Sequence, residues 1–241
     1  VHWGSDEEQR DEAITERIGH PGHINLMERT VELMDEHASA KSRALDLGCA
    51  VGRTTFDLSR TFSKVTGLDF SQAFIDAANV LKSNGRLDYQ RLETGQFSTP
   101  MVASVADEID RDKIDFVVGD AMDLADIPAL AENGPYDAIL LSNLMCRLTT
   151  PAACLTQFTA DDTYIGKGGI LVFASPNTWM EQYTDPDLFL DGGSSEETLA
   201  KLGSLLPGFT QMHEEDLPFM IREHRRKYEY IVSQVSVWRK D

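Results

Sequence analysis

A glycine-rich turn between a strand and a helix constrains this chain more than any other feature. Residues 44–53 read ALDLGCAVGR, in which a short apolar run carries Asp46 and leads into Gly48-x-x-x-Gly52. Glycine has no Cβ, so the backbone of such a turn can lie close to a ligand, and the following helix offers free N–H groups at its start. The G-x-G-x-x-G spacing of a dinucleotide site is absent. The turn therefore predicts a ligand site, with an ordinary strand-to-helix turn as the alternative.

Short apolar runs alternate with helical patterns along most of the chain. Strands are predicted at 43–47, 64–68, 114–118, 136–141 and 169–174, and helices at 24–37, 53–61, 72–84, 151–161 and near 194–206. This alternation indicates a parallel, doubly wound sheet with right-handed crossovers. Two more strands, at 210–217 and 228–238, are predicted to close the sheet as an antiparallel pair. We expect a Rossmann-like α/β fold, a seven-stranded, mostly parallel sheet with helices on both faces.

Three segments fall outside this alternation. Residues 1–40 are predicted to form an N-terminal helical extension, with an exposed helix over 5–18, and residues 41–241 form the main domain. Residues 86–112 are predicted to be an insertion that contains a β-hairpin of 88–93 and 97–105. The long aromatic loop 175–195 is predicted to act as a lid. His20 and His23 stand close together without supporting ligands, and no metal site is predicted.

The charge of the chain restricts its partners. Its 241 residues include 40 acidic and 22 basic side chains, which gives a net charge of −18. So acidic a surface repels phosphate backbones, which disfavours nucleic acids as partners. No apolar run reaches the roughly 20 residues needed to span a bilayer, no signal peptide opens the chain, and the three cysteines lack C-x-x-C spacing. We expect a cytoplasmic protein that acts on a small molecule.

Acidic and polar residues recur at the ends of the later strands. Asp69 ends the second strand, 17 residues after Gly52. An acid at this position accepts hydrogen bonds from ribose hydroxyls in nucleotide sites. Asp120 follows the third strand, and Asn143 follows the fourth. Because the carboxyl ends of parallel strands meet at one edge of a sheet, these side chains are expected to share one site.

Taken in order, these motifs resemble those of class I S-adenosyl-L-methionine (SAM)-dependent methyltransferases. Their first motif is D-x-G-x-G-x-G, and here Ala50 replaces the middle glycine, while Lys167-Gly168-Gly169 is similar to the family's K-P-G-G turn. The resemblance implies SAM as cofactor and S-adenosyl-L-homocysteine (SAH) as product, with Asp120 on the adenine amino group. The predicted cofactor-binding residues are Asp46, Gly48, Cys49, Gly52, Arg53, Asp69, Phe70, Asp120, Ala121, Met122, Ser142 and Asn143.

Six longer strings resemble a narrower family, the methyltransferase domain of ovothiol biosynthesis. They are ALDLGCAVGR (44–53), GLDFSQAFIDAA (67–78), YQRLETG (89–95), SNLMCRL (142–148), SPNTWMEQYT (175–184) and PFMIREHRRKYEY (218–230). That domain is similar to the C-terminal part of 5-histidylcysteine sulfoxide synthase and methylates an imidazole nitrogen of 5-thiohistidine (4-mercaptohistidine). The resemblance implies that substrate and suggests that the chain is part of a larger ovothiol synthase.

The resemblance and the positions of polar residues give candidates for the chemistry. The predicted catalytic residues are Asn143, which lines the methyl channel in the family, Tyr183, and His224, a proton relay with an unperturbed pKa near 6.5. Arg147 is predicted to pair with the substrate carboxylate and Glu181 with its amine. The predicted substrate-binding residues are Arg147, Trp179, Glu181, Tyr183, Arg222 and Tyr228. The alternatives are a structural ion pair for Arg147, lid packing for the aromatic residues and a surface position for His224.

Three other functions remain open at this point. A class I methyltransferase could act on another small molecule. A nicotinamide-dependent oxidoreductase is disfavoured by the missing G-x-G-x-x-G. A non-catalytic SAM-binding module would keep Gly48, Gly52, Asp69 and Asp120 without turnover.

Overall fold

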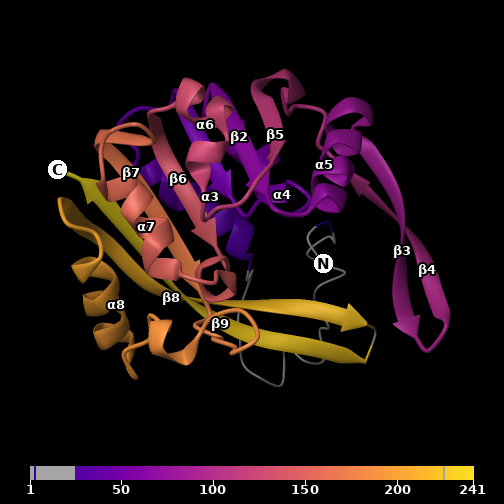
Figure 1. The fold of residues 1–241 in the computed structure, drawn as a ribbon. Coiled ribbons are helices and arrows are strands. Elements are labelled where there is room, and N and C mark those ends of the chain that lie inside the picture. Colours follow the sequence, from indigo (N-terminus) through magenta and orange to yellow (C-terminus); the bar gives the residue numbers. More distant parts are fainter. Residues whose placement is uncertain (1–2, 4–24, 225) are drawn as a thin grey trace.

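The protein is built on one seven-stranded sheet. The computed structural model describes Trp3, residues 25–224 and residues 226–241. The strand order is β5-β2-β1-β6-β7-β9-β8, and β9 runs antiparallel to both of its neighbours, β7 and β8 (Figure 1). The strands are β1 (Arg43–Leu47), β2 (Lys64–Asp69), β5 (Ile114–Val118), β6 (Tyr136–Ser142), β7 (Ile165–Ser175), β8 (Phe209–His224) and β9 (Lys227–Lys240). The predicted seven-stranded, mostly parallel sheet is confirmed.

Helices connect the strands and cover both faces. They are α3 (Leu26–His37), α4 (Arg53–Leu58), α5 (Gln72–Asn84), α6 (Pro128–Asn133), α7 (Pro151–Thr159) and α8 (Ser195–Ser204). Four 3-10 turns add η1 (Arg111–Lys113), η2 (Leu124–Asp126), η3 (Met145–Arg147) and η4 (Pro186–Leu188). The predicted helix at 53–61 is wrong in length, since α4 ends where the Ser59 hydroxyl donates to the carbonyl of Phe56. The predicted helix over 5–18, His20 and His23 lie outside the described residues.

The two faces of the sheet bury two separate cores. Side chains alternate along a strand, so Ala44 and Leu45 of β1 point to opposite faces. The face of Ala44 packs against α3 and α4, and the face of Leu45 packs against α7 and α8. Both strand residues are fully buried, as expected for a parallel sheet that is covered on both sides. Although α3 was assigned to an N-terminal extension, Leu33 and Met34 make it part of this core.

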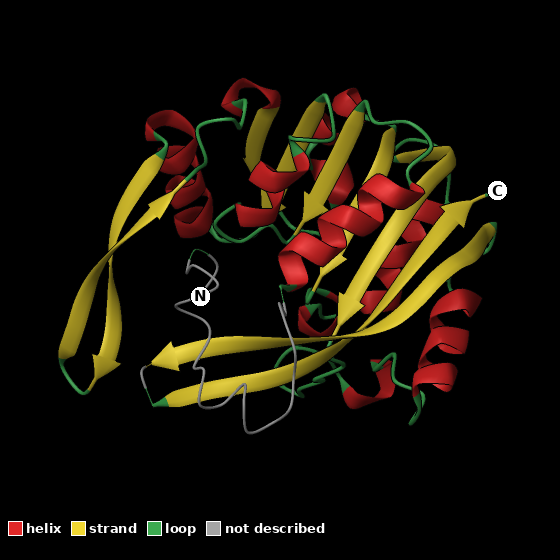
Figure 2. Ribbon diagram, turned by 180° about the vertical axis from the view of Figure 1, so that it is seen from behind, coloured by secondary structure: helices red, strands yellow, loops and turns green. Residues whose placement is uncertain are grey.

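Two hairpins project beyond the sheet. The predicted hairpin of the insertion is confirmed as β3 (Arg86–Thr94) and β4 (Phe97–Ser104), a sheet of its own. The second arm is formed by β8 and β9, which are longer than predicted. Residues 234–239 of β9 pair with β7, whereas residues 227–233, which come before them in the chain, pair only with β8 among the described residues. The two arms extend toward each other (Figure 2). Glu93 and Arg222 form an ion pair between them, with 3.3 Å from Glu93 Oε2 to Arg222 Nη2.

The predicted lid, residues 175–195, packs against the body of the protein. Thr184 is fully buried, and its hydroxyl donates to the carbonyl oxygen of Leu148 over 2.6 Å. The Trp179 ring stacks on Phe189 with a centroid distance of 5.4 Å. These contacts hold the loop in place, and its opening stays a prediction. Among the described helices, none is long and apolar enough to cross a membrane.

Candidate active site

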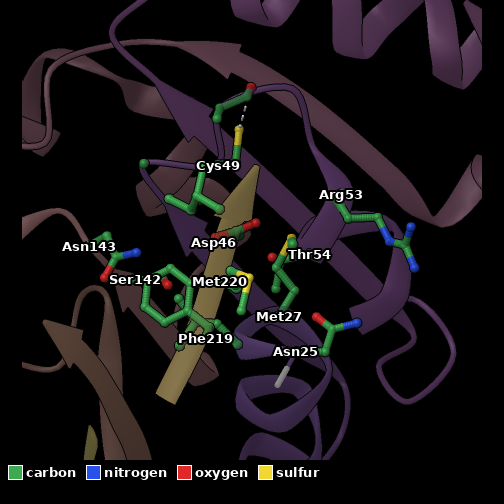
Figure 3. Close-up of a pocket in the computed structure, with 14 residues that line it drawn as sticks. Asn25, Met27, Asp46, Cys49, Arg53, Thr54, Ser142, Asn143, Phe219 and Met220 are labelled. Atoms are coloured by element: carbon green, nitrogen blue, oxygen red, sulfur yellow. Dashed lines mark hydrogen bonds between the residues drawn. The ribbon is translucent and has the colours of Figure 1, made fainter. Parts of the chain in front are cut away.

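A cleft opens at the carboxyl edge of the sheet, where β1 and β6 end. It encloses about 730 Å³ including its open mouth, within the usual range for ligand sites. Its lining residues are Asn25, Leu26, Met27, Asp46, Gly48, Cys49, Ala50, Arg53, Thr54, Ser142, Asn143, Phe219, Met220 and Ile221. Figure 3 shows Arg53 and Asn25 on one side and Ser142 and Asn143 on the other, with Asp46, Met27 and Met220 between them.

The turn from Gly48 to Gly52 forms one wall of the cleft, and its conformation favours glycine at these two positions. The N–H groups of Gly48 and Cys49 both donate to the carbonyl oxygen of Leu68, over 2.8 and 2.9 Å. Gly52 has a φ of +83°, and a Cβ there would lie 2.6 Å from the Phe116 ring. The turn therefore folds back tightly onto β2, and this exposes its backbone to the cleft.

Ala50, the middle residue of the turn between Gly48 and Gly52, is held in a left-handed conformation. Its φ is +49°, a region that disfavours residues with a Cβ. Its N–H donates to Oδ2 of Asp69 over 2.9 Å, which fixes the turn against the second strand. The sequence departs here from the D-x-G-x-G-x-G motif that it resembles, but the backbone keeps a conformation for which glycine is suited.

Asp46 is a buried carboxylate on the floor of the cleft. Its side chain is 2% exposed, and the Thr55 hydroxyl donates to its Oδ2 over 2.7 Å. Burial raises the pKa of Asp46 to about 6, against the hydrogen bond from Thr55, and the nearby charge of Asp69 raises it further. A carboxylate in this setting favours a cationic ligand group, which would offset the cost of its desolvation.

The remaining predicted cofactor residues lie beside the cleft on the neighbouring strand ends. Asp69 ends β2 and accepts from the N–H of Ala50 and, at Oδ1, of Ser71. Asp120 follows β5 and accepts from the N–H of Met122. The ring of Phe70 is 77% exposed at this edge. The structure thus brings the ends of β1, β2, β5 and β6 together as predicted, although Asp69, Phe70, Asp120, Ala121 and Met122 do not line the cleft itself.

Asn143 stands at the opposite end of the cleft from Arg53. Its φ is +53°, and its N–H donates to the carbonyl oxygen of Ala174 over 2.7 Å. The hydroxyl of Ser233 on β9 donates to Asn143 Oδ1 over 3.2 Å. This hydrogen bond occupies the amide oxygen and leaves the amide NH₂ as the group that faces a ligand.

The sequence did not predict the wall that β8 and α3 contribute. Phe219, Met220 and Ile221 come from β8, and Met27 comes from the first turn of α3. The string at 218–230 drew attention to Arg222 and Tyr228 instead, because β8 was expected to end at 217. The continuous apolar run Phe219–Ile221 was the signal that could have extended the strand.

The predicted substrate residues cluster away from the cleft. The guanidinium group of Arg147 donates to the carbonyl oxygen of Thr178 over 2.8 Å and lies 5.1 Å from the ring centroid of Tyr183. Trp179 packs on Phe189, and Glu181 is exposed. Arg147 links the 175–195 loop to η3, and none of the four residues lines the cleft. Their roles toward a substrate stay predictions.

Arg222, His224 and Tyr228 lie on the arm formed by β8 and β9. They were expected where the chain returns to the sheet, and that placement is wrong, because β8 continues to His224. Arg222 pairs with Glu93 and faces Tyr228 across the arm. His224 sits at the hairpin tip, where its Nδ1 accepts from the N–H of Arg226. In this structure none of the three lines the cleft.

Replacing Ala50 with glycine should relieve strain in the turn. A left-handed alanine costs about 1 kcal/mol, which is partly offset by the greater freedom of glycine in the unfolded chain. We expect Ala50→Gly to melt at the same temperature as the wild type or up to a few degrees higher in differential scanning fluorimetry. Gly52→Ala, which places a Cβ against Phe116, should lower the midpoint. A clear loss of stability in Ala50→Gly would contradict this account.

Replacing Asp46 with asparagine should stabilise the ligand-free protein in a pH-dependent way. Because the folded pKa, about 6, lies above the ordinary value of 3.8, ionisation of Asp46 opposes folding, and its cost grows as pH rises from about 4 to 6. A shift of about two units corresponds to ~3 kcal/mol. Urea unfolding should show Asp46→Asn more stable than the wild type at pH 8 and equal near pH 4. The exposed Asp76→Asn variant is the control, and equal stability at pH 8 would refute the burial argument.

Residues 45–161, just under half of the chain, match a family model described as a methyltransferase domain. A search of curated protein sequences found no match. The fold is similar to N-methyltransferase NodS from Bradyrhizobium japonicum WM9 in complex with SAH, at 13% identity and a TM-score of 0.54, covering 90% of this chain and 88% of that one.

Two further solved structures share the fold. Magnesium protoporphyrin IX methyltransferase (ChlM) from Synechocystis PCC 6803 with bound SAM has 14% identity and a TM-score of 0.51, covering 94% of this chain and 89% of that one. The [4+2]-cyclase SpnF has 15% identity and a TM-score of 0.53, covering 88% and 80%. The cyclase illustrates that this fold alone does not fix the reaction. Residues 45–161 therefore resemble a methyltransferase domain, and the described chain shares its fold with these solved structures.

Proposed function

We propose that this protein transfers a methyl group from SAM to an imidazole ring nitrogen of 5-thiohistidine. The proposal of methyl transfer rests on the cleft at the carboxyl edge of the sheet, which is lined by the glycine turn and the buried Asp46. Both lie within residues 45–161, the segment that matches the methyltransferase-domain model. The acceptor rests on the six strings that resemble the ovothiol methyltransferase domain. Membership of a larger synthase is part of the same proposal.

The residues of the cleft suit the proposed cofactor. Asp46 offers a buried carboxylate to the ammonium group of the methionine portion. The turn at Gly48 and Gly52 presents backbone without side chains, and Asp69 retains lone pairs for ribose hydroxyls beside it. SAM, when bound, supplies an electrophilic methyl group on a sulfonium.

The protein's task is then to position the acceptor and exclude water. A neutral imidazole nitrogen can attack directly and lose its proton afterwards, so orientation matters more than a strong base. The thiohistidine sulfur is a competing nucleophile, and the site must hold it out of line. Asn143, with its oxygen engaged by Ser233, presents N–H donors at one end of the cleft. Phe219 and Met220 supply an apolar wall on which a flat ring could pack.

The product of the reaction tests this proposal directly. We expect mass spectrometry to detect one added methyl group on the ring nitrogen of 5-thiohistidine after incubation with SAM, and none on histidine incubated alongside. Methyl on sulfur, or on histidine, would keep the methyltransferase class and overturn the acceptor. Binding of SAM with no methylated product from either compound would indicate another acceptor or a non-catalytic role.

Removing the Asn143 side chain should slow the reaction more than it weakens cofactor binding. Asn143→Gly keeps the left-handed backbone and deletes the amide, so we expect kcat/KM to fall roughly tenfold or more, as for the loss of a positioning group. SAH affinity by calorimetry should fall by a smaller factor. The matched control is Asn177→Gly, since Asn177 also has a positive φ, of +51°, but bonds to Gln234 outside the cleft. Equal losses in both variants would refute a specific role for Asn143.

A further inference from the structure

Ser233 places a buried hydroxyl in an otherwise apolar stripe of β9. Alternate residues of a strand share a face, and Ile231, Val235 and Val237, which share the face of Ser233, pack in the core that contains α3. Ser233 itself is fully buried. A buried hydroxyl costs free energy unless it is hydrogen-bonded, and this one donates to Oδ1 of Asn143. The hydrogen bond to Asn143 therefore explains why a serine interrupts the stripe.

The hydrogen bond between Ser233 and Asn143 spans the end of β7. In the sheet, β7 lies between β6 and β9, and its last residue, Ser175, pairs with Gln234. Ser233 lies one residue beyond that pair, and among the described residues its strand partner is Leu217 of β8. Its side chain can therefore reach past the end of β7 to Asn143, which follows β6.

This hydrogen bond determines the orientation of the Asn143 amide. The backbone of Asn143 is fixed by its N–H, which donates to the carbonyl oxygen of Ala174, so the side-chain amide is the part that can still turn. With Oδ1 bonded to Ser233, the amide nitrogen points toward the middle of the cleft (Figure 3). In the reverse orientation, the Ser233 proton would lose the side-chain acceptor that it has among the described residues. Ser233 thus makes the group that faces the cleft a donor.

The neighbouring strand end shows the same arrangement with the opposite polarity. Asn177, which also has a positive φ, follows β7, and its amide NH₂ donates to Oε1 of Gln234 over 3.2 Å. The amide NH₂ of Gln234 is itself engaged by the carbonyl oxygen of Ser195, which fixes its oxygen toward Asn177. Two consecutive residues of β9 therefore set two asparagine amides in opposite senses, and of these two asparagines Asn143 is the one that lines the cleft.

We propose that Ser233 is a positioning residue that makes Asn143 a hydrogen-bond donor to the sulfur of the acceptor and so favours methylation of the ring nitrogen over the sulfur. This inference rests on the proposed function. A thiolate sulfur accepts hydrogen bonds and donates none, so an amide NH₂ attracts it and an amide oxygen repels it. A sulfur whose lone pairs are engaged by Asn143 is a weaker nucleophile and is held in place, which leaves the ring nitrogen free to react.

The experiment measures the ratio of N-methyl to S-methyl product that the full chain forms from SAM and 5-thiohistidine, by liquid chromatography and mass spectrometry against both standards. In Ser233→Ala the amide is free to turn, and the ratio should fall roughly tenfold, as for the loss of one hydrogen bond. Ser233→Thr, which keeps a hydroxyl, should restore most of the ratio. A slower reaction with an unchanged ratio in Ser233→Ala would indicate a structural role alone and overturn the proposal.

Asn143→Asp provides a second test, which leaves Ser233 in place. Aspartate has nearly the shape of asparagine and still accepts from Ser233, but it presents an oxygen to the cleft in either orientation. We expect it to lower the ratio at least as far as Ser233→Ala does. Adding Ser233→Ala to Asn143→Asp should then change the ratio by less than about threefold, because no orientation is left to select. Fully additive effects of the two substitutions would refute the coupling between them.

Ser236→Ala is the matched control. Ser236 is also a buried serine of β9, but it lies on the opposite face of the strand, where its hydroxyl oxygen accepts from Nε1 of Trp238 over 3.0 Å. Its loss should lower the melting temperature and leave the product ratio unchanged. A similar fall in the ratio there would trace the Ser233 result to β9 as a whole and overturn the proposal.

The wild-type products separate a failure of this inference from a failure of the proposed function. If the wild type forms neither product, the proposed function fails and takes the inference with it. Sulfur as the main methylated atom in the wild type would overturn the inference, because there would be no preference for nitrogen to explain. N-methyl product from the wild type, with the same ratio in Ser233→Ala and Asn143→Asp, would overturn the role of Ser233 alone.

Discussion

The structure depends on the backbone of one turn, in which Gly48, Ala50 and Gly52 all adopt positive φ angles. Two hydrogen bonds from the N–H groups of Gly48 and Cys49 to the carbonyl oxygen of Leu68 hold the turn, and a third runs from the N–H of Ala50 to Asp69. Because alternate residues are left-handed, the chain reverses at once from β1 into α4. The polar side of the cleft follows from this reversal, because Asp46 lies just before the turn and α4, whose first residue is Arg53, begins just after it.

Asp46 shows the cost that such a site imposes. Its raised pKa means that the folded protein disfavours the charge that a cationic ligand group needs. Binding of that group supplies the missing counter-charge, so ligand binding and stability are coupled through one side chain. The hydrogen bond from Thr55 lessens the penalty without removing it. Destabilising groups of this kind are typical of functional sites rather than of cores.

Much of the fold could be predicted from the sequence, because its signals are local. Apolar runs indicated the five parallel strands. Gly48, Gly52 and Asp69 indicated where the first two strands end, and therefore at which edge of the sheet the site lies. The arm of β8 and β9 was underestimated because nothing local shows that residues 218–224 gain support from a distant hairpin through Arg222 and Glu93. The approach of α3 to the cleft was missed for the same reason, since it depends on packing against the sheet.

The candidate site likewise has one part that local sequence predicts and one part that depends on long-range packing. The polar part of the cleft is built by the strand ends and the glycine turn, and several of its lining residues, including Asp46, Arg53 and Asn143, had been predicted from the sequence as cofactor-binding residues. The wall formed by Met27, Phe219 and Met220 comes from segments far apart in sequence, and it is apolar. Asp46 and Arg53 supply the charge of the cleft, and the apolar wall lies between the Arg53 side and the Asn143 side (Figure 3). A ligand with a charged group and a flat ring would find partners in both parts, whereas a ligand with a second charge near Met220 would leave that charge without a partner among the described lining residues. Selection among ligands is therefore expected to depend on these long-range contacts, which vary independently of the glycine turn.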